Sequence, residues 1–172
     1  MGTAISRMQF LRGDIGGRNV PVRPPWALAE ELFTQRCTRC GDCIGACPTG
    51  ILHQGRGGFP QVDFSRGECL FCTDCSTACK PAALQKLSDR APWPLKAALD
   101  AETCIAFQGV ECRACADPCE PRAIRVRPRV GGVALPVIDL STCNGCGACY
   151  APCPVRAITI SRESPQNSTI AN

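Results

Sequence analysis

The sequence is poor in the features that build a large apolar core. Aromatic residues make up 5% of its 172 residues, and no apolar run approaches the length of a membrane span. Histidine occurs once, at His53, so the chain lacks the imidazoles that many metal sites use. Side-chain packing alone cannot stabilise such a chain, and disulfides or bound metal must contribute.

Several functional signals are missing as well. No glycine motif for nucleotide binding and no nucleophile–base pair stands out, so we expect a protein that is not an enzyme. The N-terminal stretch "MGTAISRMQFLRGDIGG" lacks the paired arginines and the apolar segment of a twin-arginine export signal. We therefore expect a cytoplasmic protein, because a reducing compartment keeps thiols free.

Cysteine is abundant instead, with sixteen residues in four groups of four. Groups one, two and four share the spacing C-x2-C-x2-C-x3-C, and proline follows every group within two residues. Group one is Cys37, Cys40, Cys43 and Cys47, group two is Cys69, Cys72, Cys75 and Cys79, and group four is Cys143, Cys146, Cys149 and Cys153. Group three is Cys104, Cys112, Cys115 and Cys119, in which the first cysteine stands eight residues ahead of the second.

This spacing is typical of bacterial ferredoxins, whose thiolates hold cubes of iron and sulfide. Two-residue gaps let one loop offer three thiolates. The fourth cysteine, which we expect to start a short helix, reaches the other cluster of a two-cluster unit. Zinc is the rival metal, but zinc sites usually use two separated C-x2-C pairs or add histidines. A disulfide scaffold is the other alternative, and it would require a secretory context.

The groups pair along the chain into two units. Glycine-rich turns separate the groups of each pair, with strands expected near 51–54 and 60–64 and again near 123–127 and 133–139. We therefore expect an α+β fold of two tandem ferredoxin-like units of the two-cluster bacterial type, loop-rich, with short hairpins and short helices. The expected division is an N-terminal arm with a short helix (1–36), unit one (37–81), a linker (82–103), unit two (104–161) and a disordered tail (162–172).

Pairing within each unit predicts four ligand sets. Cluster one uses Cys37, Cys40, Cys43 and Cys79, cluster two Cys69, Cys72, Cys75 and Cys47, cluster three Cys104, Cys112, Cys115 and Cys153, and cluster four Cys143, Cys146, Cys149 and Cys119. We expect four [4Fe-4S] clusters, because group three keeps all its cysteines and a loop absorbs extra residues at small entropic cost. The alternative is three clusters, with Cys104 left as a thiol.

The charges leave two interpretations open. The formal net charge of +4 counts thiols as neutral, and four clusters of about −2 each would bring it to about −4, so it does not indicate a nucleic-acid partner. Arg125, Arg127 and Arg129 lie on one face of an expected strand, which is either solvated or a docking patch for an acidic partner. The stretch "RPPW" at 23–26 is either a partner anchor or packed on the chain's own surface.

Six stretches make the comparison more specific: "RPPW", "CTRC" at 37–40, "RGGFPQVDF" at 56–64, "VECRACADPCEP" at 110–121, "CNGCGAC" and "CPVRAI". Together they resemble the NapF family of ferredoxin-type accessory proteins of the periplasmic nitrate reductase system, over nearly the whole chain. The stretched third group resembles the family's own form. Members often begin with "SRR", where this chain has "SRM".

The resemblance implies a cytoplasmic iron–sulfur protein that does not span the membrane. It would act on the catalytic subunit of the periplasmic nitrate reductase before export, helping that precursor to acquire or reduce its own cluster. An electron-transfer ferredoxin that feeds the quinol and nitrate reductase pathway is the alternative. A purely structural metal protein is the third candidate.

Overall fold

In the computed structural model, residues 21–87 and 91–162 are described, and every element among them is short. The helices are α2 (Glu30–Arg36), α3 (Asp42–Gly45), α4 (Asp74–Thr77) and the 3-10 turn η1 (Arg56–Gly58). The strands are β1 (Leu52–Gln54), β2 (Pro60–Val62), β3 (Leu95–Leu99), β4 (Ile124–Arg129), β5 (Gly132–Ile138) and β6 (Ile158–Arg162). This content confirms a loop-rich α+β protein.

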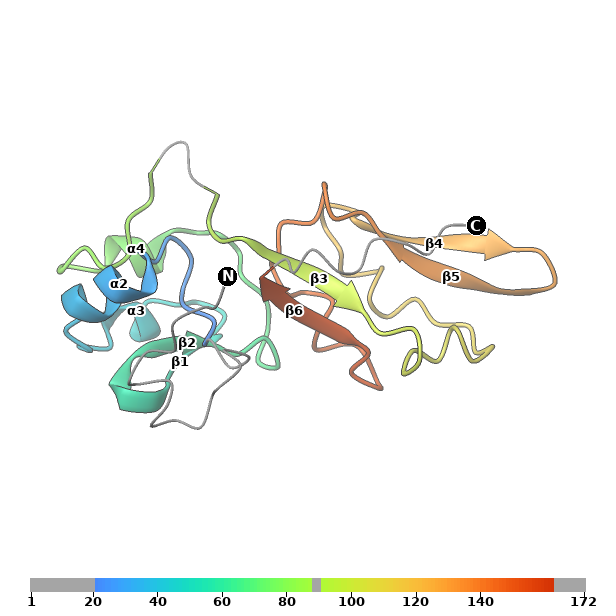
Figure 1. Ribbon diagram of the computed structural model, residues 1–172, viewed down its shortest axis with the longest axis horizontal. Helices are drawn as coiled ribbons and strands as arrows, with labels where there is room; N and C mark the ends of the chain where they lie inside the picture. The colour runs from blue at the N-terminus through green and yellow to red at the C-terminus, as the bar shows by residue number, and fades with distance from the viewer. Residues whose placement is uncertain (1–20, 88–90, 163–172) are drawn as a thin grey trace, which may run out of the picture.

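The molecule is elongated, with its two halves end to end (Figure 1). The first half, residues 21–87, carries all three α-helices and the β1–β2 hairpin, and the second half, residues 91–162, carries the other four strands. Among the described residues, no helix is long and apolar enough to cross a membrane. The expected "SRM" arm and most of the expected tail lie outside the described residues.

Both hairpins that the sequence predicts are present. β1 pairs antiparallel with β2, and β4 pairs antiparallel with β5. Glycines permit the turns, because Gly57 and Gly131 have φ angles of 68° and 73°, a region that other residues enter only with strain. Each hairpin follows one cysteine group and leads the chain into the next.

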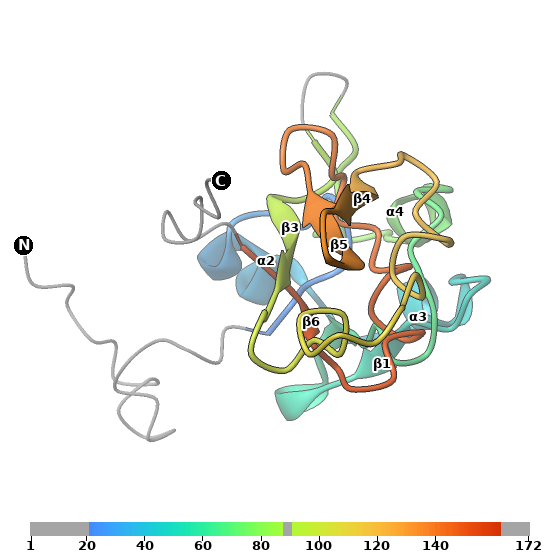
Figure 2. The ribbon, with the colours of Figure 1, turned by 90° about the vertical axis from the view of Figure 1, so that its right-hand side faces the viewer.

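A further pairing closes each half. β3, which lies within the expected linker, pairs antiparallel with β6. It also lies against β5, and Figure 2 shows the two side by side. In the first half, Ala27 forms an antiparallel bridge with Leu84, next to a 3.1 Å hydrogen bond from the Leu28 N–H to the Ala83 carbonyl. Thus, in each half, the segment before the first cysteine pairs with the segment after the last cysteine.

The "RPPW" stretch belongs to the core of the first half. Arg23 makes a two-pronged ion pair with Glu30, with N–O distances of 2.6 and 3.0 Å, and donates to the Pro60 carbonyl at 3.2 Å. Trp26 is 3% exposed and packs in one cluster with Phe33 of α2. Of the two interpretations of this stretch, packing on the chain's own surface is the one the structure shows.

Cysteines take the place of apolar side chains in two small cores. The first contains Cys43 and Cys75 beside aliphatic and aromatic residues, and the second contains Cys115 and Cys149. A third cluster, built on Phe64, Trp93 and Leu95, lies where the two halves meet. Each half therefore has buried thiols in its core, where ligand binding affects packing directly.

Candidate metal centres

In groups one and two, a residue in left-handed conformation follows the second cysteine. Gly41 and Thr73 have φ angles of 85° and 75°, and each precedes a four-residue helix that contains the third cysteine of its group, Cys43 or Cys75. The expectation that the fourth cysteine starts a helix is wrong, because this turn ends before Cys47 and before Cys79. The third cysteine therefore lies within the tight turn, and the fourth cysteine follows just after the turn ends.

All sixteen cysteines lie in the described ranges and are free thiols. The structure brings them together in four sets, each of which takes three thiols from one group and one from the paired group. In the first set, burial and the neighbouring thiolates of Cys79, Cys37 and Cys40 raise the pKa of Cys43 to about 11. Residues of groups one and two therefore meet, although 36 positions separate Cys43 from Cys79.

The second and fourth sets each line a cavity. One cavity is bordered by Cys47, Cys69, Cys72 and Cys75, and another by Cys119, Cys143, Cys146 and Cys149. Burial and the adjacent thiolates raise the pKa values of Cys75 and Cys149 to about 12. Thiols with such pKa values stay protonated at neutral pH unless a metal replaces the proton.

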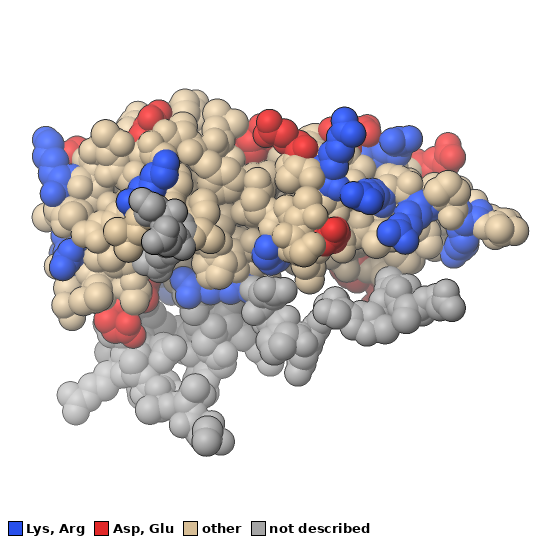
Figure 3. All heavy atoms as spheres, turned by 90° about the horizontal axis from the view of Figure 1, so that it is seen from above, with Lys and Arg blue, Asp and Glu red and all other residues tan. Residues whose placement is uncertain are grey.

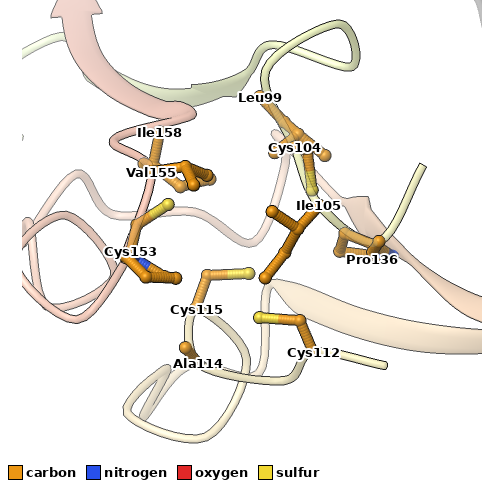
Figure 4. A pocket seen from close by; sticks show the side chains of 12 residues that line it. Leu99, Cys104, Ile105, Cys112, Ala114, Cys115, Pro136, Cys153, Val155 and Ile158 are labelled. Carbon is orange, nitrogen blue, oxygen red and sulfur yellow. The ribbon is translucent and has the colours of Figure 1, made fainter. Parts of the chain in front are cut away.

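The stretched third group forms the same kind of site. Cys104, Cys112 and Cys115 line a cavity together with Cys153, and their sulfur atoms turn toward a common space in Figure 4. The empty space, including its open side, is about 320 Å³, against about 340 and 300 Å³ in the second and fourth sets. The longer loop therefore leaves the position of Cys104 intact.

The extra residues of that loop fold on themselves. Gly109 adopts a φ of 90°, and the Val110 N–H donates to the Ile105 carbonyl at 3.0 Å. Ala106 is 1% exposed and packs with Cys104, while Val110 is half exposed. The start of the insertion, residues 105–107, thus packs toward the protein, and residues 108–111 form an exposed turn.

The segment after each group repeats four times, which sequence reasoning missed. The third residue after the last cysteine has positive φ and donates its N–H to that cysteine's carbonyl, at 3.2, 3.0, 2.8 and 3.3 Å for Gly50, Ala82, Arg122 and Arg156. The next residue is fully buried, as Ile51, Ala83, Ala123 and Ala157. The signal is a small or aliphatic residue four positions after the last cysteine. Group three keeps this pattern too.

Aspartates shape the entry to three of the cysteine loops, and sequence reasoning missed these as well. The backbone N–H groups of Asp63, Asp100 and Asp139 each donate at 2.8 Å to the carbonyl of a buried residue that follows a cysteine group. Each carboxylate accepts an N–H from two residues further along, at 2.9 to 3.0 Å. Hydrogen bonds from Ser141 and Thr142 lower the pKa of Asp139 to about 2.

A basic surface lies beside the thiols of the second half. Arg113, Arg122 and Arg125 border a surface hollow that also touches Asp117 and Cys119. Arg125, Arg127 and Arg129 of β4 are all exposed. Figure 3 shows lysine and arginine side chains along the half that carries β4 and β5.

In residues 21–87 and 91–162, no three histidine, cysteine or acidic side chains stand close enough to hold a single metal ion. The thiol sets surround larger spaces, and soft thiolates in sets of four are the donors that cubane iron–sulfur clusters need. Comparison with known families supports this donor chemistry. The 4Fe-4S dicluster domain matches residues 36–83, and the 4Fe-4S binding domain matches residues 136–159.

The fold and its thiol sites define a ferredoxin-type iron–sulfur protein. The chain is 45% identical to the ferredoxin-type protein NapF of Escherichia coli (strain K12) over 154 residues, which cover 90% of this chain and 93% of that one. It is 42% identical to the NapF protein of Haemophilus influenzae over 91% of this chain and 93% of that one. The chain therefore belongs to the NapF family of ferredoxin-type proteins.

A more distant relative is the ferredoxin-type protein NapG of Haemophilus influenzae. It is 33% identical over 161 residues, which cover 82% of this chain and 58% of that one. The two matched 4Fe-4S domains include groups one, two and four and leave Cys104 to Cys119 outside. The stretched group thus departs from the general domain pattern.

Proposed function

We propose that the chain binds four [4Fe-4S] clusters, one in each thiol set. The sets are Cys37, Cys40, Cys43 and Cys79; Cys69, Cys72, Cys75 and Cys47; Cys104, Cys112, Cys115 and Cys153; and Cys143, Cys146, Cys149 and Cys119. The observation that carries this proposal is that every set combines thiols from two groups, as two-cluster ferredoxin units require. When bound, such clusters accept and release single electrons.

The chain's own residues hold the sulfur ligands in position. The Phe71 N–H points at the Cys69 sulfur at 3.4 Å, and the Ala157 N–H points at the Cys153 sulfur at 3.2 Å. Burial raises the pKa of Cys47, but the Thr49 hydroxyl and backbone N–H groups outweigh it, so the pKa is lowered overall. Donors of this kind stabilise the negative charge of a ligated sulfur and tune the potential of its cluster.

We propose that the molecule is a tandem pair of ferredoxin-like units, 37–81 and 104–161. The four repeated segments after the cysteine groups support this division. So do the two closing pairings, Ala27 with Leu84 and β3 with β6, which occupy the same place in each half. On this view the residues 82–103 contribute a closing strand to both units in addition to joining them.

In the cell, we propose that this protein matures the catalytic subunit of the periplasmic nitrate reductase. It would bind that precursor in the cytoplasm and help it to acquire or reduce its iron–sulfur cluster before export. The support is membership of the NapF family over nearly the full length of both chains. The protein provides cluster chemistry to a client and is not itself an enzyme.

The second candidate is an electron-transfer ferredoxin of the quinol and nitrate reductase pathway. The observation that favours it is the direct contact between the ligand-bearing loops of the two halves, described below. A carrier needs such a continuous path, whereas an assembly factor does not.

A strain that lacks this protein separates the two candidates. The exported nitrate reductase would be assayed with reduced viologen, a dye that bypasses the natural electron donors. The maturation role predicts normal export with low dye-linked activity, because the enzyme itself would be incomplete. Full dye-linked activity with poor nitrate reduction in whole cells would overturn that role and establish the electron-transfer one.

A further inference from the structure

The two halves meet through their cysteine loops. The N–H of Cys69, in group two, donates to the carbonyl of Cys146, in group four, at 2.8 Å. No residue intervenes between the two proposed ligands at this point. The contact therefore joins the second thiol set to the fourth across the boundary of the halves.

Aromatic side chains pack beside this contact. Phe64 and Phe71 of the first half pack edge-on against Trp93, with ring centroids 5.8 and 5.7 Å apart. The Trp93 indole N–H donates to the carbonyl of Asn144, in the group-four loop, at 3.2 Å. Phe64 and Trp93 are 7% and 9% exposed.

The thiol sets within each half are also neighbours. Cys43 of the first set and Cys75 of the second belong to one buried cluster, and Cys115 and Cys149 share another. The four sets are thus ordered in space as one, two, four and three. Sequence order would have placed the third set at the boundary, and the structure places it at the far end instead.

From this order we propose that the molecule relays electrons along its length and that they cross between the halves at the Cys69–Cys146 contact. This inference rests on the proposed occupation of all four sets. With clusters held by the Cys69 set and the Cys146 set, each crossing would move one electron, oxidising the donor cluster in one half and reducing the acceptor cluster in the other. No bond is made and no proton moves. A reduced one-electron carrier protein supplies the electron at one end, and an oxidised one accepts it at the other.

Two glycines in equivalent positions allow a matched test. Gly147 follows Cys146 as Gly41 follows Cys40, and their φ angles are 86° and 85°. A Cβ atom on Gly147 would lie 2.0 Å from the Phe64 ring, whereas a Cβ on Gly41 would meet nothing within 4 Å. Gly147→Ala therefore carries the same backbone strain as Gly41→Ala and in addition pushes the two halves apart.

The readout is electron paramagnetic resonance of the chemically reduced proteins, with iron and sulfide content measured on the same samples. Wild type should show spin–spin broadening between clusters, and Gly41→Ala reports how much of any change the backbone strain alone causes. Gly147→Ala should keep the iron content of Gly41→Ala but lose part of the broadening and saturate at lower microwave power. Equal spectra for the two variants would overturn the relay through this contact.

The proposed occupation of all four thiol sets is tested separately from the relay. Wild-type protein with fewer than about 16 iron atoms per fully loaded chain would disprove four occupied sets, whatever the spectra show. Should Gly147→Ala fail to hold iron, Phe64→Ala loosens the boundary of the halves without backbone strain, because it removes the packing of Phe64 on Trp93 beside the Cys69–Cys146 contact. Unchanged spectral broadening in that variant, at full iron content, would also overturn the relay.

Discussion

At the scale of single residues, Cys104 distinguishes the four proposed clusters from the alternative of three. Its thiol faces the same cavity as those of Cys112, Cys115 and Cys153 (Figure 4). Replacing it by serine removes one soft ligand and leaves three thiols of the set. We expect Cys104→Ser to lower the iron content from about 16 to about 12 atoms per chain, or to leave a three-iron cluster with a distinct resonance signal.

The matched control lies in the same loop. Val110 is exposed and carries no ligand atom, so Val110→Ala should keep the wild-type iron content. Wild-type iron content and spectra in Cys104→Ser would show that the cysteine is only a buried thiol and that the chain holds three clusters.

Asp139 is the second residue with a testable role, because its carboxylate accepts three hydrogen bonds from Ser141 and Thr142 ahead of Cys143. These bonds depress its pKa to about 2, from about 4 in an unfolded chain. The stabilisation is therefore complete above about pH 4 and is lost as the pH falls through about 2. We expect Asp139→Asn to lose its clusters faster than wild type at neutral pH, with the difference vanishing near pH 2.

Stopped-flow pH jumps that follow the visible cluster absorbance would measure these rates. Asp117→Asn is the control, because Asp117 is exposed and makes only a 3.6 Å pair with Arg113. A pH-independent difference between wild type and Asp139→Asn would contradict the role of the charged carboxylate.

The grouping of the cysteines was predictable, but the residues that support the cysteine loops were not. Cysteine spacing identifies a thiolate group because its chemistry requires free thiols at short intervals. Asp63, Asp100 and Asp139 are single carboxylates in loops, and in a sequence they resemble any solvated charge. Their role depends on a hydrogen bond to a residue in another part of the chain, such as Ala123 or Ala157, which local patterns do not reveal.

At the scale of elements, the hairpins were predictable and the β3–β6 pairing was not. The glycine turns predict the hairpins β1–β2 and β4–β5, since the two strands of each hairpin lie within a few residues of its turn. β3 follows Pro92 and Pro94 in a segment that reads as a linker, and its partner lies about 60 residues away. Such long-range pairing leaves little local trace in the sequence.

The exposed arginines of β4 give a prediction for the β4–β5 element. Replacing Arg125, Arg127 and Arg129 by glutamine should weaken binding of the nitrate reductase precursor at low ionic strength, if the partner's surface is acidic. The difference from wild type should shrink as salt is added, because exposed charges are screened beyond about 10 Å at 0.1 M.

Arg36 and Arg56, which are exposed on the first half, supply the control. Their replacement by glutamine should leave precursor binding at the wild-type level. Equal loss in both variants would show a general charge effect, and no loss in either would show that the β4 face is only solvated. Titration calorimetry at two salt concentrations would measure the affinities.

At the scale of the whole molecule, the thiols stand where other proteins have an apolar core. Cys43, Cys75, Cys115 and Cys149 occupy the centres of the two main buried clusters. Each of these thiols belongs to one of the four proposed ligand sets. We expect removal of iron by a chelator to abolish most of the helix and strand signal in circular dichroism, because the metal's binding energy is the folding energy.

Restoring iron and sulfide under reducing conditions should restore that signal together with the visible absorbance of the clusters. A chelated chain with an unchanged spectrum would contradict the dependence of the fold on metal. It would mean that the short strands and the aromatic contacts of Trp26 and Trp93 suffice to hold the chain.

The pairings that close the two halves also determine the order in which the halves can fold during translation. The first half is complete once Leu84 has paired with Ala27, whereas β3 must wait for β6, near the end of the described chain. Domains fold as they emerge from the ribosome, N-terminal first. On the proposed cluster binding, the first half would be ready to take up iron while the second is still being translated, and the cysteine sets of the second half would stay open until β6 has been made.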